Sequence, residues 1–200
     1  MHGEGNIIEM NETLNLYISN YFGVTDLEQL KFINQLFVSK LVIKGEFLVE
    51  QEKLCDDLAF VENGFMRMHT LVDGNEITQW ISGPGHFATE LQSFIFNTPS
   101  RWNIQAISDT TIFTISKENY QRVCDTIPLW NQLEKAFLIK CFTTLENRVF
   151  SHLSMSAEER YQNFEFHFPD IFRSVPQSYI ASLLGMTPET FSRIRKKISK

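Results

Sequence analysis

The sequence lacks the features that mark disulfide-bonded, metal-binding and membrane-spanning chains. Its three cysteines, Cys55, Cys124 and Cys141, are widely separated and include no Cys-x-x-Cys pair, so we expect neither a disulfide framework nor a zinc or iron–sulfur site. There is no run of about 18 apolar residues, and residues 1–10 have neither a basic start nor an apolar stretch. We therefore expect a cytoplasmic protein with no membrane span, signal peptide, metal or other cofactor.

Motifs for catalysis are missing as well. No serine or cysteine stands with a histidine and a carboxylate at a recognisable motif spacing, and there is no glycine-rich phosphate-binding loop. We therefore do not expect an enzyme.

Basic residues are sparse over most of the chain and concentrated at its end. Residues 187–200 carry five Lys or Arg against the single Glu189, a net charge of +4, which leaves −10 for the preceding 186 residues of a chain whose total is −6. An acidic protein with a basic end is not a general polyanion binder. It can still hold phosphates locally, because charge attraction is short-ranged at physiological salt.

Residues 39–115 have the composition of short β-strands, which is rich in β-branched and aromatic residues and broken by turn residues. The hairpin turn Val72-Asp73-Gly74-Asn75 is the clearest of these breaks. The expected strands are 39–43, 47–49, 58–61, 65–71, 76–81, 103–106 and 111–115. Seven strands with no intervening helix predict a sandwich or jelly roll. Short helical patterns in residues 11–37 precede them.

A long helical pattern follows the strands. Apolar residues recur every four positions at Leu129, Leu133, Phe137, Cys141, Leu145, Val149 and Leu153. Such a helix needs more than one neighbour. It can pack against its own β domain, but we favour a second copy of the same helix across a two-fold axis. A capping box at Ser156–Glu159 then predicts another helix that ends near Pro169.

The last 24 residues, 177–200, have the spacing of a helix-turn-helix. Ala181 is small enough for a tight helix crossing, and Gly185 suits a turn with positive φ. The second helix has a clear start signal. Thr187 is a good N-cap and Pro188 has a fixed φ that suits the first helical position. Glu189 places a negative charge at the positive end of the helix dipole. The alternative is an ordinary amphipathic pair with solvated charges, which the local basic excess argues against.

The second helix of this pair has a polar face. Thr190, Arg193 and Lys197 recur at spacings of three and four, so they share the side away from the apolar residues. A recognition helix presents such a face to the DNA major groove.

The order of parts, a β-roll, a long helix and a C-terminal helix-turn-helix, resembles the family of the cyclic-AMP receptor protein and the fumarate-and-nitrate-reduction regulators (Crp/Fnr). The likeness is most specific in IASLLGMTPETFSRIRKK, residues 180–197. It implies that Glu189 and Arg193 contact base edges, which suits cytosine N4 and guanine O6 and N7. Thr187 and Thr190 would make backbone or mixed contacts, and Lys197 would contact phosphates. At the start of the preceding helix, Gln177 and Ser178 would donate to phosphate.

The sequence departs from that family in two places. Members usually continue into a β-hairpin wing, whereas this chain ends three residues after Lys197, so we expect wing contacts to be missing or replaced. Members that bind cyclic nucleotides hold them with a Gly-Glu pair and a later Arg-Ser. Here Glu90 follows Ala88-Thr89, and Ser100-Arg101 stands in reversed order. Because side chains alternate along a strand, we expect Arg101 to point away from the pocket unless the loop adjusts.

The sequence thus predicts an α+β chain with three parts: a cyclic-nucleotide-binding-like β-roll with N-terminal helices (1–116), a long dimerisation helix (117–153) and a helix-turn-helix DNA-binding domain (154–200). Its predicted partners are duplex DNA, a second copy of the chain and, as a further candidate, RNA polymerase. Glu90, Ser100 and Arg101 are the candidate ligand-binding residues, for an unknown effector that we do not expect to be cyclic AMP. The alternative is a ligand-binding module that acts through protein contacts, and salt dependence of binding would separate the two.

Overall fold

The structure, a computed structural model, describes residues 11–198. Two helices come first, α1 (Glu12–Phe22) and α2 (Leu27–Asn34). Asn11 caps α1 by accepting from the Leu14 backbone N–H, and Asp26 caps α2 by accepting from that of Gln29. Both helices therefore begin where a short polar side chain satisfies a free backbone donor.

The β region forms two antiparallel sheets that face each other as a jelly roll, as the sequence predicts. The first has the order β1-β7-β3, with bounds Val38–Val42, Thr110–Ser116 and Asp57–Asn63. The second has the order β2-β6-β4-β5, with bounds Phe47–Val49, Asn103–Ala106, Met66–Val72 and Asn75–Ser82. The β4–β5 hairpin turns at Asp73 and Gly74, which both have positive φ.

The expectation that no helix interrupts the strands is wrong. Helix α3 (Leu91–Phe96) lies between β5 and β6 and begins at Glu90, whose Oε2 accepts from the Ser93 backbone N–H at 2.7 Å. A helix of six residues is too short to show a periodic pattern. Its cap is a glutamate, which is not one of the residues that usually mark a helix start.

Residues 117–153, expected as one long helix, contain parts of two. Helix α4 (Lys117–Thr126) ends before Pro128, and α5 (Trp130–Ser154) begins after Leu129, whose φ is +65°. Proline disfavours helical geometry in the residue before it, and Ile127 is extended accordingly, with ψ of 116°. The 25 residues of α5 match the long helix that the apolar spacing predicts from residue 129.

The core of the roll joins α1 and α5 to both sheets. Phe60 of β3 is fully buried and lies beside the rings of Tyr17 and Tyr21. Phe22 of α1 stacks on Trp130 and also contacts Phe137, both with ring centres 4.9 Å apart. The first half of α5 is therefore part of the roll's own hydrophobic core.

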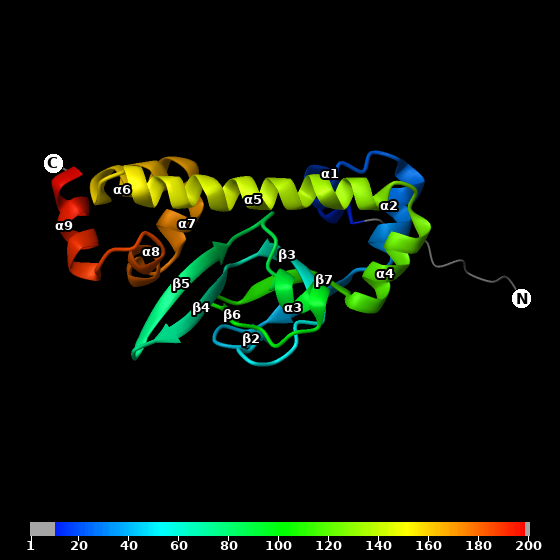
Figure 1. The fold of residues 1–200 in the computed structure, drawn as a ribbon, viewed down its shortest axis with the longest axis horizontal. Helices are drawn as coiled ribbons and strands as arrows, with labels where there is room; N and C mark the ends of the chain where they lie inside the picture. The colour runs from blue at the N-terminus through cyan, green and yellow to red at the C-terminus, as the bar shows by residue number, and fades with distance from the viewer. Residues whose placement is uncertain (1–10, 199–200) are drawn as a thin grey trace, which may run out of the picture.

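Four further helices complete the part of the chain that the structure describes. Helix α6 (Ala157–His167) begins with the predicted capping box and ends before Pro169. Helix α7 (Pro169–Ser174), which the sequence reasoning missed, precedes α8 (Gln177–Leu183) and α9 (Pro188–Ile198). Figure 1 shows α5 running above the sheets from the N-terminal helices to α6, with α8 beside β5 and α9 at the far end.

Candidate functional site

Helices α8 and α9 meet as the sequence predicts. Ala181 is fully buried at the crossing, and Gly185 in the turn has φ of +66°. The pair has its own small core together with α6 and α7, in which Phe191 lies against the rings of Tyr161 and Phe172. This core holds α9 by its apolar side and leaves its polar side outward.

The start of α9 is capped and charged. The backbone N–H of Thr190 donates to Thr187 Oγ1 at 3.2 Å, as an N-cap requires. Hydrogen bonds from its own backbone N–H and from Thr187 lower the pKa of Glu189. An ionised, fully exposed carboxylate therefore stands at this helix end, ready to accept hydrogen bonds.

The outer face of α9 is a shallow hollow. Its lining residues are Pro188, Glu189, Ser192, Arg193 and Lys196. The structure thus brings Glu189 and Arg193 together on this face, whereas Thr190 is half-buried, with its hydroxyl 3.3 Å from that of Thr187. Sequence reasoning missed Ser192 and Lys196, although their spacing of three from Glu189 and Arg193 marks the same helix face.

The remaining predicted DNA contacts are exposed. Gln177 and Ser178 form the first turn of α8, and their side chains face solvent. Lys197 Nζ pairs with Glu158 Oε2 of α6 at 2.6 Å, and both side chains are partly exposed. Because exposed ion pairs are weak, a phosphate can replace Glu158 as the partner of Lys197.

The helix-turn-helix is attached to the β4–β5 hairpin through buried polar contacts. Arg67 of β4 is 1% exposed, and its guanidinium carbon lies 3.9 Å from the ring centre of Tyr179 in α8. Its Nε donates to Thr78 Oγ1 at 2.9 Å and its Nη1 to Glu76 Oε2 at 2.5 Å. Ser182 of α8 accepts from the Thr78 N–H. Strands β4 and β5 and helix α8 are thereby held together.

A second arginine joins three elements at the same junction. Arg148 of α5 donates through Nη1 to the Gln79 carbonyl of β5 and through Nη2 to the Leu183 carbonyl of α8. Burial lowers the pKa of Arg148. Since α5, β5 and α8 meet at one guanidinium, Arg148 links the long helix to both the roll and the helix pair.

A cavity of about 390 Å³ opens in the roll beside α5. Its walls come from β4, β5, the segment before α3 and the middle of α5, and are formed largely by apolar side chains such as Met66, Met68 and Trp102. Glu90 and Arg101 line this cavity, whereas Ser100 does not. Arg101 therefore reaches the cavity in spite of the reversed Ser-Arg order, which is the outcome expected if the loop adjusts.

The reason lies in the loop before β6. Ser100 is buried, and its hydroxyl donates to the Trp102 carbonyl at 2.7 Å and accepts from the Trp102 N–H at 3.2 Å. This local turn is not strand, so the alternation of side chains does not apply to it. It places Arg101 on the cavity with an exposed side chain.

Among residues 11–198, no group of three His, Cys, Asp or Glu side chains is placed to hold a metal ion. In the same part of the chain, no helix has the length and hydropathy of a membrane span.

Comparison with known proteins agrees with this architecture. The model of the cyclic nucleotide-binding domain family matches residues 40–126, and no curated protein sequence matches the chain. FixK2 from Bradyrhizobium japonicum has a similar structure, with a TM-score of 0.69, 18% identity and coverage of 82% of this chain and 84% of FixK2.

Two further structures extend the likeness. The catabolite activator protein of Thermus thermophilus has a TM-score of 0.56 at 22% identity, covering 90% of this chain and 86% of its own. A protein of Eubacterium rectale assigned to the Crp/Fnr family has a TM-score of 0.65 at 19% identity, covering 90% and 88%. Residues 40–126 therefore match the cyclic nucleotide-binding domain family, and the chain shares the fold of these three solved structures.

Proposed function

We propose that this protein is a transcription regulator that binds a specific duplex DNA sequence as a homodimer. The observation that carries the proposal is the outer face of α9, where Glu189, Arg193 and Lys196 stand exposed beside the half-buried Ser192. The helix is capped and is fixed by its apolar side. A helix held in this way fits the major groove.

Each predicted contact has a chemical role. Arg193 reads guanine through O6 and N7, and Glu189 accepts from cytosine N4. Gln177, Ser178, Thr187 and Lys197 hold backbone phosphates, and Thr190, which is half-buried, adds a mixed contact. Lys196, on the hollow face with Arg193, adds a further phosphate contact.

The dimer forms along α5, from the middle of the helix to its end. Large apolar side chains are exposed there among polar ones: Leu138, Ile139, Phe142, Leu145, Val149, Phe150 and Leu153. A monomer that leaves such a stripe in water is at risk of aggregation, and a second copy of the helix covers it. The two-fold axis then presents two α9 helices to two half-sites.

An effector binds the roll cavity and changes the relative stability of two dimer arrangements. In one the two α9 helices are spaced to enter the major groove at both half-sites, and in the other they are not. We propose that it is not cyclic AMP. Ser100 is turned into its own loop, and Glu90 uses one carboxylate oxygen to cap α3. The cations on this cavity, Arg101 and Lys140, are both exposed, so a cyclic phosphate would meet only cations that solvent screens. Calorimetry with millimolar cyclic AMP tests this, and micromolar binding that is lost in Arg101→Ala would contradict it.

The fold likeness to Crp/Fnr regulators also supports contact with RNA polymerase and a cytoplasmic location as parts of the same proposal. The second candidate function, a ligand-binding module that acts through protein contacts, is favoured by the family match, which covers the roll and not α8 or α9.

Selection from random duplex DNA with the purified full chain separates the two candidates. We expect a pseudo-palindromic site, and an affinity that falls steeply as salt rises, because phosphate contacts release counterions. If no sequence is enriched and the weak residual binding does not depend on salt, the DNA-binding proposal is wrong and the protein-contact function takes its place.

A further inference from the structure

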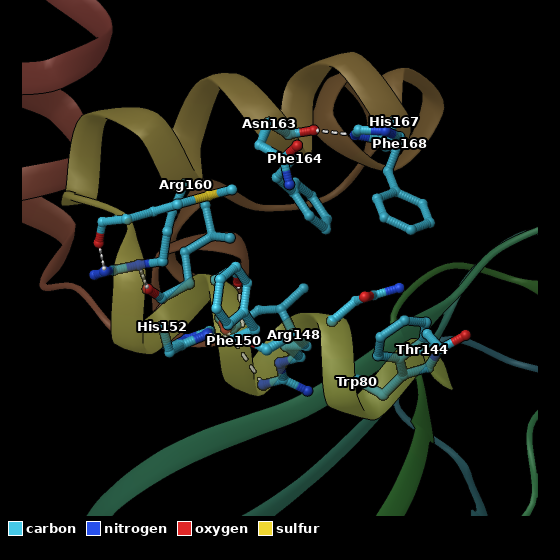
Figure 2. A pocket seen from close by; sticks show the side chains of 15 residues that line it. Trp80, Thr144, Arg148, Phe150, His152, Arg160, Asn163, Phe164, His167 and Phe168 are labelled. Atoms are coloured by element: carbon cyan, nitrogen blue, oxygen red, sulfur yellow. Dashed lines mark hydrogen bonds between the residues drawn. The ribbon is translucent and has the colours of Figure 1, made fainter. Parts of the chain in front are cut away.

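A second cavity, of about 410 Å³, lies where the roll meets the helix-turn-helix. Figure 2 shows it between α5 and α6, with Phe164 and Phe168 pointing towards it from above and Trp80 closing the lower side. Its walls come from β5, α5, α6 and α8. Trp80 and Thr144 also line the roll cavity, so the two cavities are neighbours, and any test must tell them apart.

One end of this junction cavity is aromatic. The ring of Phe168 lies 6.2 Å from that of Trp80, at a steep angle, and 5.1 Å from that of Phe164. Three rings from β5, α6 and the residue after α6 thus form a surface that suits a planar apolar group.

The other end is cationic. Arg160 lies there with His152 (Figure 2), and its Nε and Nη1 donate to the Leu184 and Met155 carbonyls. Nη2 of Arg160 makes no hydrogen bond to the described residues. Arg148 adds a second guanidinium to the lining. None of the 15 lining residues is an Asp or Glu, although the chain as a whole carries a charge of −6.

We propose that the junction cavity binds a small aromatic carboxylate, with its ring against Trp80, Phe164 and Phe168 and its carboxylate on Arg160. The volume is in the range of small-molecule sites, about 300 to 1,000 Å³, which are common at domain boundaries. Charge-assisted bonds from a guanidinium to a carboxylate are among the stronger polar contacts available to such a ligand. Because the occupant touches β5, α5, α6 and α8 together, it braces the roll against the helix-turn-helix.

The test uses calorimetry of the full chain with 2-naphthoate, and with 2-naphthalenemethanol as the neutral analogue of similar shape. We expect saturable naphthoate binding in the micromolar range and at least tenfold weaker binding of the alcohol. Asn147 lines the cavity from α5 with an exposed side chain, so Asn147→Trp fills the space and should abolish binding.

Three further variants test the role of the Arg160 charge and which of the two cavities holds the naphthoate. Arg160→Gln should weaken naphthoate binding at least tenfold, while Arg173→Gln, which removes the same charge from exposed α7, should leave it unchanged. Arg101→Ala, in the roll cavity, should also leave it unchanged. The proposal is overturned by absence of saturation at millimolar naphthoate, by equal binding of the alcohol, or by loss of binding in Arg101→Ala with Asn147→Trp unaffected. If Arg160→Gln does not fold, the comparison with the alcohol and the Asn147→Trp variant still test whether the junction cavity binds naphthoate.

Discussion

Both halves of α5 carry large apolar residues, but only the first half buries any of them fully. In the first half Phe137 is 1% exposed and lies against Phe22, Tyr21 and Phe87 of its own roll. In the second half Leu153 is 82% exposed. The same run of apolar residues therefore completes a hydrophobic core at one end and is left without a partner at the other.

The difference follows from helix geometry. A four-residue step overshoots a full helical turn by about 40°, so a stripe of apolar residues at every fourth position winds around the helix. Phe137 and Cys141 face the roll, while Val149 and Leu153 have rotated towards solvent. One pattern in the sequence thus serves folding first and, in our proposal, association second.

The largest expected effect is at Phe137. Phe137→Ala leaves a cavity among aromatic rings and should lower the free energy of unfolding by about 3 to 5 kcal/mol. Denaturant unfolding followed by circular dichroism measures it. A loss below about 1 kcal/mol would mean that this half of α5 is not part of the core.

The next effect concerns association. Phe142→Glu and Leu145→Glu place a charge on the exposed stripe, so they should yield folded monomer where the parent is a dimer at micromolar concentration. Sedimentation velocity gives the oligomeric state. Glu146→Gln, at an exposed site on the same helix, is the control and should stay dimeric. A parent that is itself monomeric and still binds a palindrome contradicts the dimer proposal.

A smaller effect is expected at the junction between roll and helix-turn-helix. Arg67→Met removes the contact over Tyr179 and two hydrogen bonds, and should cost about 1 to 3 kcal/mol of stability. Lys53→Met breaks an exposed pair with Glu50 and should cost less than about 1 kcal/mol. Equal effects of the two substitutions in thermal unfolding would show that the buried contact is no stronger than a surface pair.

The smallest effect is a pH dependence at the same contact. The hydrogen bond from Arg67 lowers the pKa of Glu76. The contribution of ionised Glu76 to the free energy of unfolding is therefore fully present above the ordinary glutamate pKa of about 4.3. It is lost as the pH falls below that value. Glu76→Gln should flatten the fall in stability between about pH 5 and pH 3. If the stability of Glu76→Gln falls between pH 5 and pH 3 as steeply as that of the parent, Glu76 does not contribute to the pH dependence.

Local sequence signals predicted much of the fold. The seven strands, the Asp73-Gly74 turn, the capping box at Ser156 and the helix pair about Gly185 all appear as expected. These elements depend on neighbours within a few residues, so their signals lie in the sequence itself. Helices α3 and α7, with six residues each, are too short to show periodicity.

The candidate site was predictable in part. Spacing along one helix was enough to place Glu189 and Arg193 on one face. The side-chain direction of Arg101 was not, because it depends on a turn made by Ser100 and Trp102. The contact of Arg67 with Tyr179 joins residues more than a hundred positions apart, and no local pattern marks such a pair.

The most direct test of the central proposal is the affinity of Arg193→Ala for the selected DNA site, measured by fluorescence anisotropy at matched salt. We expect Arg193→Ala to lose about 1 to 3 kcal/mol of binding free energy, and only at the preferred sequence. The variant should also lose its base preference at one position of the site. Lys197→Ala should weaken all sequences evenly, and Arg173→Ala, on exposed α7, should change nothing. If Arg193→Ala and Lys197→Ala both bind the selected site as tightly as the parent, α9 is not the DNA-reading helix.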